Sequence, residues 1–107
     1  MTRVTIDTYR DAWKVTAKGH ATGSVEVCAA VSTLMTALAN WAFRRGGRED
    51  QVLEDGYACV VIPKRTPGAR AVMDLMISAF EMLAEDEKNY FEWVSNVGQD
   101  SETRLLS

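Results

Sequence analysis

The hydrophobic period of this chain changes near residue 24, and that change constrains the fold more than any other feature. Residues 3–9 and 13–18 alternate between two faces, which is the period of a half-buried β-strand. Arg10-Asp11 forms a tight turn between them, so the two runs predict an antiparallel hairpin that ends at Gly19. The residues directed to one face are Val4, Ile6, Thr8, Trp13, Val15 and Ala17.

Apolar residues then recur at spacings of three and four, which predicts an α-helix over roughly residues 25–45. Ser24 is the natural N-cap, and Glu26 in the first turn suits the positive end of the helix dipole. Gly46-Gly47 can adopt the left-handed conformation that ends a helix. The apolar stripe of this helix consists of Val27, Cys28, Val31, Leu34, Met35, Leu38 and Trp41.

A second pair of strands is predicted around Asp55-Gly56, which is a strong signal for a two-residue β-hairpin. The strands on either side are residues 51–54 and 57–62, and Pro63 closes the second one. Cys59 alternates with Val60 in this apolar strand, so we interpret Cys59 as a core residue.

A second helix and a last strand complete the pattern. Thr66 and Pro67 provide an N-cap and a first helical residue for a helix that runs to about Glu85. Its apolar stripe consists of Ala69, Val72, Met73, Met76, Phe80, Leu83 and Ala84. Residues 90–94 are typical of a short terminal strand.

The order β-β-α-β-β-α-β predicts an α+β fold with two layers. We expect a mostly antiparallel sheet of four or five strands with both helices on one face. A length of 107 residues with 47% hydrophobic residues suits one modest core. We therefore expect a single domain over residues 1–97 and a flexible polar tail over residues 98–107.

Charge and composition exclude several functional classes. The chain has 12 Lys and Arg against 15 Asp and Glu, which argues against non-specific binding of nucleic acid. No apolar run approaches the roughly 20 residues that span a bilayer, and the first residues form a strand pattern rather than a signal peptide. We therefore expect a cytoplasmic protein with no membrane partner. One His and two distant Cys cannot supply a four-ligand zinc site, so we expect neither metal nor cofactor.

The only His and one of the two Cys lie close together, where the first hairpin meets the first helix. Seven residues separate His20 from Cys28, and they pass through a glycine-containing turn, so the two side chains can meet across the bend. Unpaired backbone N–H groups at the helix start would stabilise a Cys28 thiolate, and His20 would hold the proton. Cysteine proteases use such a pair as nucleophile and general acid, and the same N–H groups could receive an oxyanion.

The residues alone leave a simpler interpretation open. Cys28 can be a small apolar filler on the buried helix stripe, because free Cys is commonly buried. His20 can be a loop residue that hydrogen-bonds a backbone carbonyl. Periodicity does not distinguish these two interpretations.

A resemblance to a known family favours the catalytic interpretation. Residues 18–21 (Lys-Gly-His-Ala) and residues 27–32 (Val-Cys-Ala-Ala-Val-Ser) resemble the signature of the ribosomal-processing cysteine protease family (Prp, YsxB-like). That signature is G-H-A, a variable loop, and then C-A-A/S-x-S. The predicted order of strands and helices also resembles this family over nearly the whole chain.

The resemblance implies a small, homodimeric, cytosolic endopeptidase that removes an N-terminal extension from a large-subunit ribosomal protein. It implies His20 as the general base and acid and Cys28 as the nucleophile, with Gly19 and Ser32 in supporting positions. Many members have an Asp three residues before the Cys. This chain has Val25 there, with Glu26 one residue nearer, which leaves open whether an acidic residue assists.

Two other functions stay open at this point. The same fold and protease chemistry can act on another precursor, such as a phage structural protein. Alternatively, the chain can be a non-catalytic, dimeric binding module. A homodimer is also favoured by Trp41, Phe43 and Trp93, because a domain of this size has little core in which to bury them.

Overall fold

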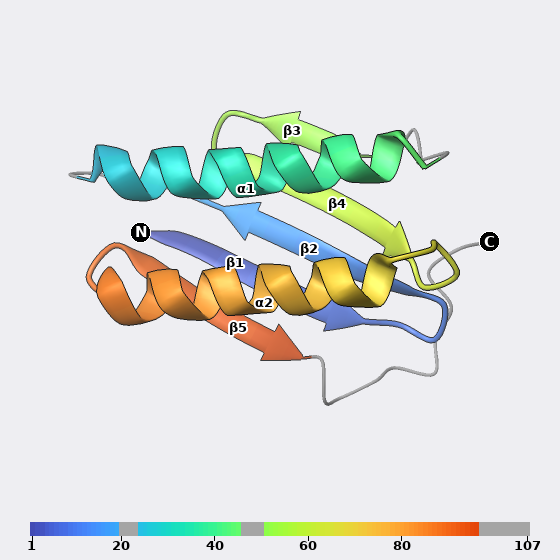
Figure 1. Cartoon of the computed structure of the whole chain (residues 1–107). Helices are drawn as coiled ribbons and strands as arrows, with labels where there is room; N and C mark the ends of the chain where they lie inside the picture. The colour runs from blue at the N-terminus through green and yellow to red at the C-terminus, as the bar shows by residue number, and fades with distance from the viewer. Residues whose placement is uncertain (20–23, 46–50, 97–107) are drawn as a thin grey trace.

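The chain forms two layers, a five-stranded sheet and two helices that cover one face of it (Figure 1). This computed structural model describes residues 1–19, 24–45 and 51–96. The elements are β1 (Thr2–Thr8), β2 (Ala12–Lys18), α1 (Val25–Phe43), β3 (Val52–Glu54), β4 (Tyr57–Pro63), α2 (Ala69–Asp86) and β5 (Phe91–Asn96). The predicted α+β class, the two layers and the order of elements are confirmed. The predicted tail, residues 98–107, lies outside the described residues.

The strands lie in the order β3-β4-β2-β1-β5, so β3 and β5 are the two edges of the sheet. The pairs β1–β2 and β3–β4 are antiparallel because each is a hairpin, and β2–β4, which joins the two hairpins, is antiparallel as well. β5 pairs in parallel with β1, because α2 carries the chain from β4 across to the opposite edge. The sheet is therefore mixed, with a single parallel pair among its described strands.

Alternation along the strands positions the core between sheet and helices. The register places Ile6 opposite Val15 and Val15 opposite Val60, and all three side chains are buried. A row of β-branched residues thus crosses the middle of the sheet beneath the helices, where such side chains pack well. The faces predicted for the first hairpin are confirmed.

Helix α1 begins as predicted, because the Ser24 Oγ accepts a hydrogen bond of 3.3 Å from the Val27 N–H. Val27, Val31, Met35 and Leu38 are buried against the sheet at the predicted spacing. The helix ends at Phe43, two residues before the predicted end. Gly46-Gly47, the predicted stop signal, lies outside the described residues.

The sequence predicted no segment long and apolar enough to span a bilayer. This was wrong, because α1 has the length and the composition of such a segment. α1 has this composition because Glu26 is its only charged residue and small residues separate its large apolar ones. In the fold, however, the helix packs its buried stripe against the sheet. α1 thus contributes one of its faces to the hydrophobic core.

Helix α2 begins at Ala69, later than the predicted N-cap at Thr66 and first helical residue at Pro67. The Ala69 N–H donates to the Thr66 carbonyl at 3.0 Å, which closes a turn with Pro67 and Gly68 at its centre. Gly68 has a φ of +82°, a conformation that glycine adopts without strain. A Pro-Gly turn therefore precedes the helix, and Gly68 is its N-cap.

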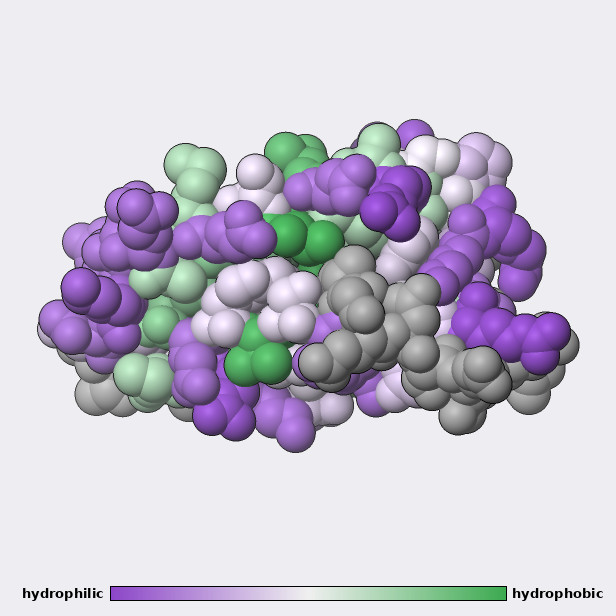
Figure 2. Space-filling model, turned by 90° about the horizontal axis from the view of Figure 1, so that it is seen from below, coloured by the Kyte–Doolittle hydropathy of each residue, from purple (hydrophilic) through white to green (hydrophobic). Residues whose placement is uncertain are grey.

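An aromatic cluster fastens α2 to the parallel edge strand. The Phe80 ring stacks on Phe91 with a centroid separation of 6.0 Å and on Trp93 at 5.3 Å. Trp41, Phe43 and Trp93 were expected to be too many for so small a core. Trp41 and Trp93 are half-buried against the core, and Phe43 is 75% exposed. Figure 2 views this side of the molecule and shows mostly hydrophilic residues with hydrophobic ones between them.

Cys59 is not a core residue, which corrects the prediction. In β4 the buried side chains of Ala58, Val60 and Ile62 face the helices, so Cys59 faces the uncovered side of the sheet and is half-buried. Its Sγ lies 4.0 Å from the Thr16 Oγ1 on the neighbouring strand. The continuous run of apolar residues in β4 concealed this alternation.

Candidate active site

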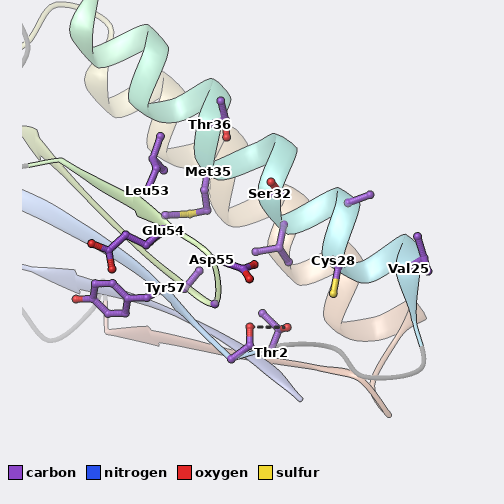
Figure 3. Close-up of a pocket in the computed structure, with 16 residues that line it drawn as sticks. Thr2, Val25, Cys28, Ser32, Met35, Thr36, Leu53, Glu54, Asp55 and Tyr57 are labelled. Atoms are coloured by element: carbon purple, nitrogen blue, oxygen red, sulfur yellow. Dashed lines mark hydrogen bonds between the residues drawn. The ribbon is translucent and has the colours of Figure 1, made fainter.

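A groove of about 640 Å³ lies between α1 and the β3–β4 hairpin (Figure 3). Cys28, Ser32 and Thr36 on α1 form one wall, and residues 53–57 of the hairpin form the other. Two small, buried sheet residues that face the helix layer, Ala17 and Ala58, also line it. Small side chains at these positions leave space between helix and sheet that larger residues would fill.

Cys28 is exposed and lines one end of this groove. The interpretation of Cys28 as filler on the buried stripe was therefore wrong. Each helical residue turns by roughly 100° from the previous one. Val27 and Val31 face the sheet, so Cys28 is rotated away from the core and toward the hairpin.

Cys28 also lies close to the amino end of α1. Its backbone N–H donates to the Ser24 carbonyl at 3.3 Å, which is the first turn of the helix. The Ser24 Oγ accepts a hydrogen bond from the Val27 N–H. The N–H groups of Val25 and Glu26 have no carbonyl partner within the helix, because they lie in its first turn. These groups and the helix dipole give this end of the groove a partial positive charge.

Ser32 lies on the same wall of the groove as Cys28, one helical turn further along. The sequence predicted that these two residues would be neighbours in the site. The structure places both at the groove, and their chemical roles stay predictions.

Gly19 lies where three segments meet at the groove. Its N–H donates to the Gly56 carbonyl at 2.9 Å, and its carbonyl accepts from the Thr2 Oγ1 at 3.4 Å. Its φ is +89°, and a Cβ at this position would lie 2.5 Å from the Met1 carbonyl oxygen. Only glycine fits here, so Gly19 holds the end of β2 against the tip of the β3–β4 hairpin.

His20 lies outside the described residues, together with residues 21–23. It directly follows Gly19, which lines the groove. The structure therefore does not test the pairing of His20 with Cys28, which stays a prediction.

The hairpin wall of the groove was not predicted as part of the site. Asp55-Gly56 was interpreted only as a turn, and Leu53, Glu54 and Tyr57 only as strand residues. No local sequence signal connects them to Cys28, because the β2–β4 pairing and the Gly19–Gly56 hydrogen bond bring them together. Within the described part of the chain, no three His, Cys, Asp or Glu side chains gather as metal ligands would.

Comparison with known proteins gives matches in structure only. No protein-family model and no curated protein sequence matches this chain. The ribosomal processing protease Prp from S. aureus, solved with a substrate peptide, has a TM-score of 0.71 and 19% identity; the match covers 89% of this chain and 99% of that one. The same protease with a covalently linked product peptide has a TM-score of 0.69 at the same identity and coverage.

A third solved structure, of a Streptococcus mutans protein, has a TM-score of 0.64 and 20% identity, and covers 89% of this chain and 98% of its own. The structural similarity thus covers most of this chain, while the sequences have diverged widely. The resemblance first seen in the motif around Gly19 and Cys28 is confirmed at the level of structure: this chain has the fold of the ribosomal processing protease Prp.

Proposed function

We propose that this protein is a cysteine endopeptidase that removes an N-terminal extension from a ribosomal protein. The observation that carries the proposal is the exposed Cys28, at the amino end of α1 and inside a groove of about 640 Å³. The proposal is supported by the shared fold, because the S. aureus protease with this fold was solved with a substrate peptide and with a covalently linked product peptide.

In the proposed mechanism, the Cys28 thiolate attacks the carbonyl carbon of the scissile peptide bond. The oxyanion that forms accepts hydrogen bonds from the N–H groups at the start of α1. His20, as imidazolium, gives its proton to the leaving amine, and the carbon–nitrogen bond breaks to leave a thioester on Cys28. His20 then takes a proton from water, whose oxygen displaces the sulfur and releases the acid.

The groove suits an extended peptide that passes between helix and hairpin. Leu53 on the hairpin wall offers an apolar contact, and Ser32 and Thr36 on the helix wall offer hydroxyl groups. A peptide in this groove would pass beside the Cys28 sulfur. Flexible N-terminal segments can adopt the extended shape at low cost because they have no folded structure to lose.

A panel of peptides tests this function directly. The protein is incubated with N-terminally extended ribosomal-protein peptides, with scrambled versions and with phage structural-precursor peptides, and products are identified by mass spectrometry. Cleavage of only the ribosomal set supports the proposal. Cleavage of only the phage set would support the first alternative, and tight binding without any cleavage would support the binding module.

The proposed pairing of His20 with Cys28 predicts unequal reactivity of the two thiols. Limited iodoacetamide at mildly acidic pH should label the exposed Cys28 much faster than the half-buried Cys59. His20→Ala should slow the labelling of Cys28, because the imidazolium that stabilises the thiolate is gone. Mass spectrometry of the two labelled peptides measures both sites in one sample. Equal labelling of both thiols, or an unchanged rate in His20→Ala, would refute the pair.

We also propose that the protein is a cytoplasmic homodimer. Phe43 is 75% exposed at the end of α1, and Glu26 is the only charged residue of that helix, which leaves an outer face that a second copy can cover. Sedimentation at micromolar concentration should give a dimer. A stable species of 11.9 kDa would contradict this part of the proposal.

A further inference from the structure

The charged side chains that line the groove in the described part of the chain are all acidic. Among the described residues that line it, the side chains charged at neutral pH are Glu54 and Asp55, and none is Lys, Arg or His. The remaining lining side chains are apolar, hydroxyl-bearing or thiol. Carboxylates on the hairpin wall attract cations, whereas the amino end of α1 carries a partial positive charge.

The two carboxylates differ in direction, although they are adjacent in the sequence. Leu53 pairs with the buried Ala58, so these two face the helix layer, whereas Glu54 pairs with Tyr57 and faces the uncovered side of the sheet. Lys18 lies over the Tyr57 ring on that side, 5.9 Å from its centroid. The Glu54 carboxylate is therefore directed away from the helix wall of the groove, toward the side of the sheet on which Lys18 lies.

Asp55 is the first residue of the turn and points the other way. Figure 3 shows its carboxylate directed into the groove, toward the wall formed by Cys28 and Ser32. Within residues 1–19, 24–45 and 51–96, Asp55 makes no hydrogen bond or ion pair.

We propose that Asp55 is a specificity residue, which binds a Lys or Arg side chain of the substrate peptide close to the scissile bond. This inference rests on the proposed function, since the peptide must lie in the groove beside Cys28. The ammonium or guanidinium group would form a charge-assisted contact with the carboxylate that has no other described partner. The substrate class is thus a peptide with a basic residue near the cleavage site.

The test uses one cleavable host peptide in which a single position at a time, on either side of the scissile bond, carries Lys or the neutral Gln. For the wild-type protein, one position should show a kcat/KM about threefold to tenfold higher with Lys than with Gln, as expected for a partly screened ion pair. The preference should weaken when the salt concentration rises from about 0.05 M to 0.5 M.

Asp55→Asn should abolish this preference while leaving the hairpin intact, because Asn has nearly the size and shape of Asp and Gly56 still supplies the positive φ of the turn. Asp55→Lys should reverse it, so that a peptide with Glu at that position becomes the better substrate. Glu54→Gln is the matched control, since it removes the neighbouring carboxylate on the opposite face, and it should keep the preference for Lys.

Two results would overturn the inference: a Lys preference that survives Asp55→Asn, or one that Glu54→Gln removes equally. If no peptide is cleaved, the proposed endopeptidase fails, but fluorescence anisotropy with labelled Lys and Gln peptides still decides the role of Asp55. Tighter binding of the Lys peptide that Asp55→Asn removes would uphold the inference. Equal binding of both peptides, or no binding of either, would reject it.

Discussion

Cys28→Ala is expected to abolish peptide cleavage and to leave the fold unchanged. The sulfur is the attacking atom in the proposed mechanism, so its removal should lower kcat/KM by about a thousandfold or more. The side chain is exposed, so its loss opens no cavity, and Ala is a good helix former. Product formation by chromatography and thermal unfolding of the same sample measure the two effects separately. Cys28→Ser should be equally inactive, because a hydroxyl does not form the anion that a thiol forms.

Cys59→Ala is the matched control for this experiment. Cys59 is the other thiol of the chain, and it is half-buried on the uncovered face of the sheet, away from the groove. Its replacement should leave kcat/KM unchanged and cost at most about 1 kcal/mol of unfolding free energy. Turnover retained in a clean sample of Cys28→Ala would exclude the protease mechanism.

Period and turn residues predicted the fold well wherever one local signal acted alone. The alternation through Val4 and Ile6 and the cap at Ser24 each depend on neighbouring residues only, and both are confirmed. At Thr66-Pro67-Gly68 two local signals compete. The positive φ at Gly68 closes a turn that excludes the preceding residues from the helix.

Predictions that depend on burial were less secure. The apolar stripe of a helix has residues along its two edges, and the sequence does not reveal which of these edge residues are buried and which are exposed. Cys28 is such a residue, and the sheet beneath α1 decides that Val27 is buried while Cys28 is not. In β4, likewise, the helices cover only one face of the sheet. Val60 lies on that face and is buried, whereas Cys59 lies on the other face and is half-buried.

The candidate site could be predicted only for the wall that is contiguous in sequence. Gly19, Cys28 and Ser32 lie within one short segment, and all three line the groove. Asp55 lies far along the chain and reaches the groove because β4 pairs with β2 in one particular register. A single sequence holds no record of that register, because alternation specifies which face a residue occupies but not which strand lies beside it.

The largest effect on stability is expected from Phe80→Ala, at the opposite edge of the sheet from the groove. Phe80 is 0% exposed and stacks on both Phe91 and Trp93, so it connects α2 to the parallel strand β5. Truncation of a buried Phe costs about 3 to 5 kcal/mol, through lost burial and the cavity left behind. The total free energy of unfolding of a domain of this size is about 5 to 15 kcal/mol, so Phe80→Ala should lower the urea midpoint markedly.

Met82→Ala is the control, because Met82 is on the same helix but 64% exposed. It should change the free energy of unfolding by less than about 0.5 kcal/mol. Equal urea midpoints for the two variants would contradict the aromatic packing.

The damage from Phe80→Ala should not reach Cys28. Because β5 pairs only with β1 among the described strands and lies far from β3 in the sheet order, the folded fraction of Phe80→Ala should still show the reactive Cys28.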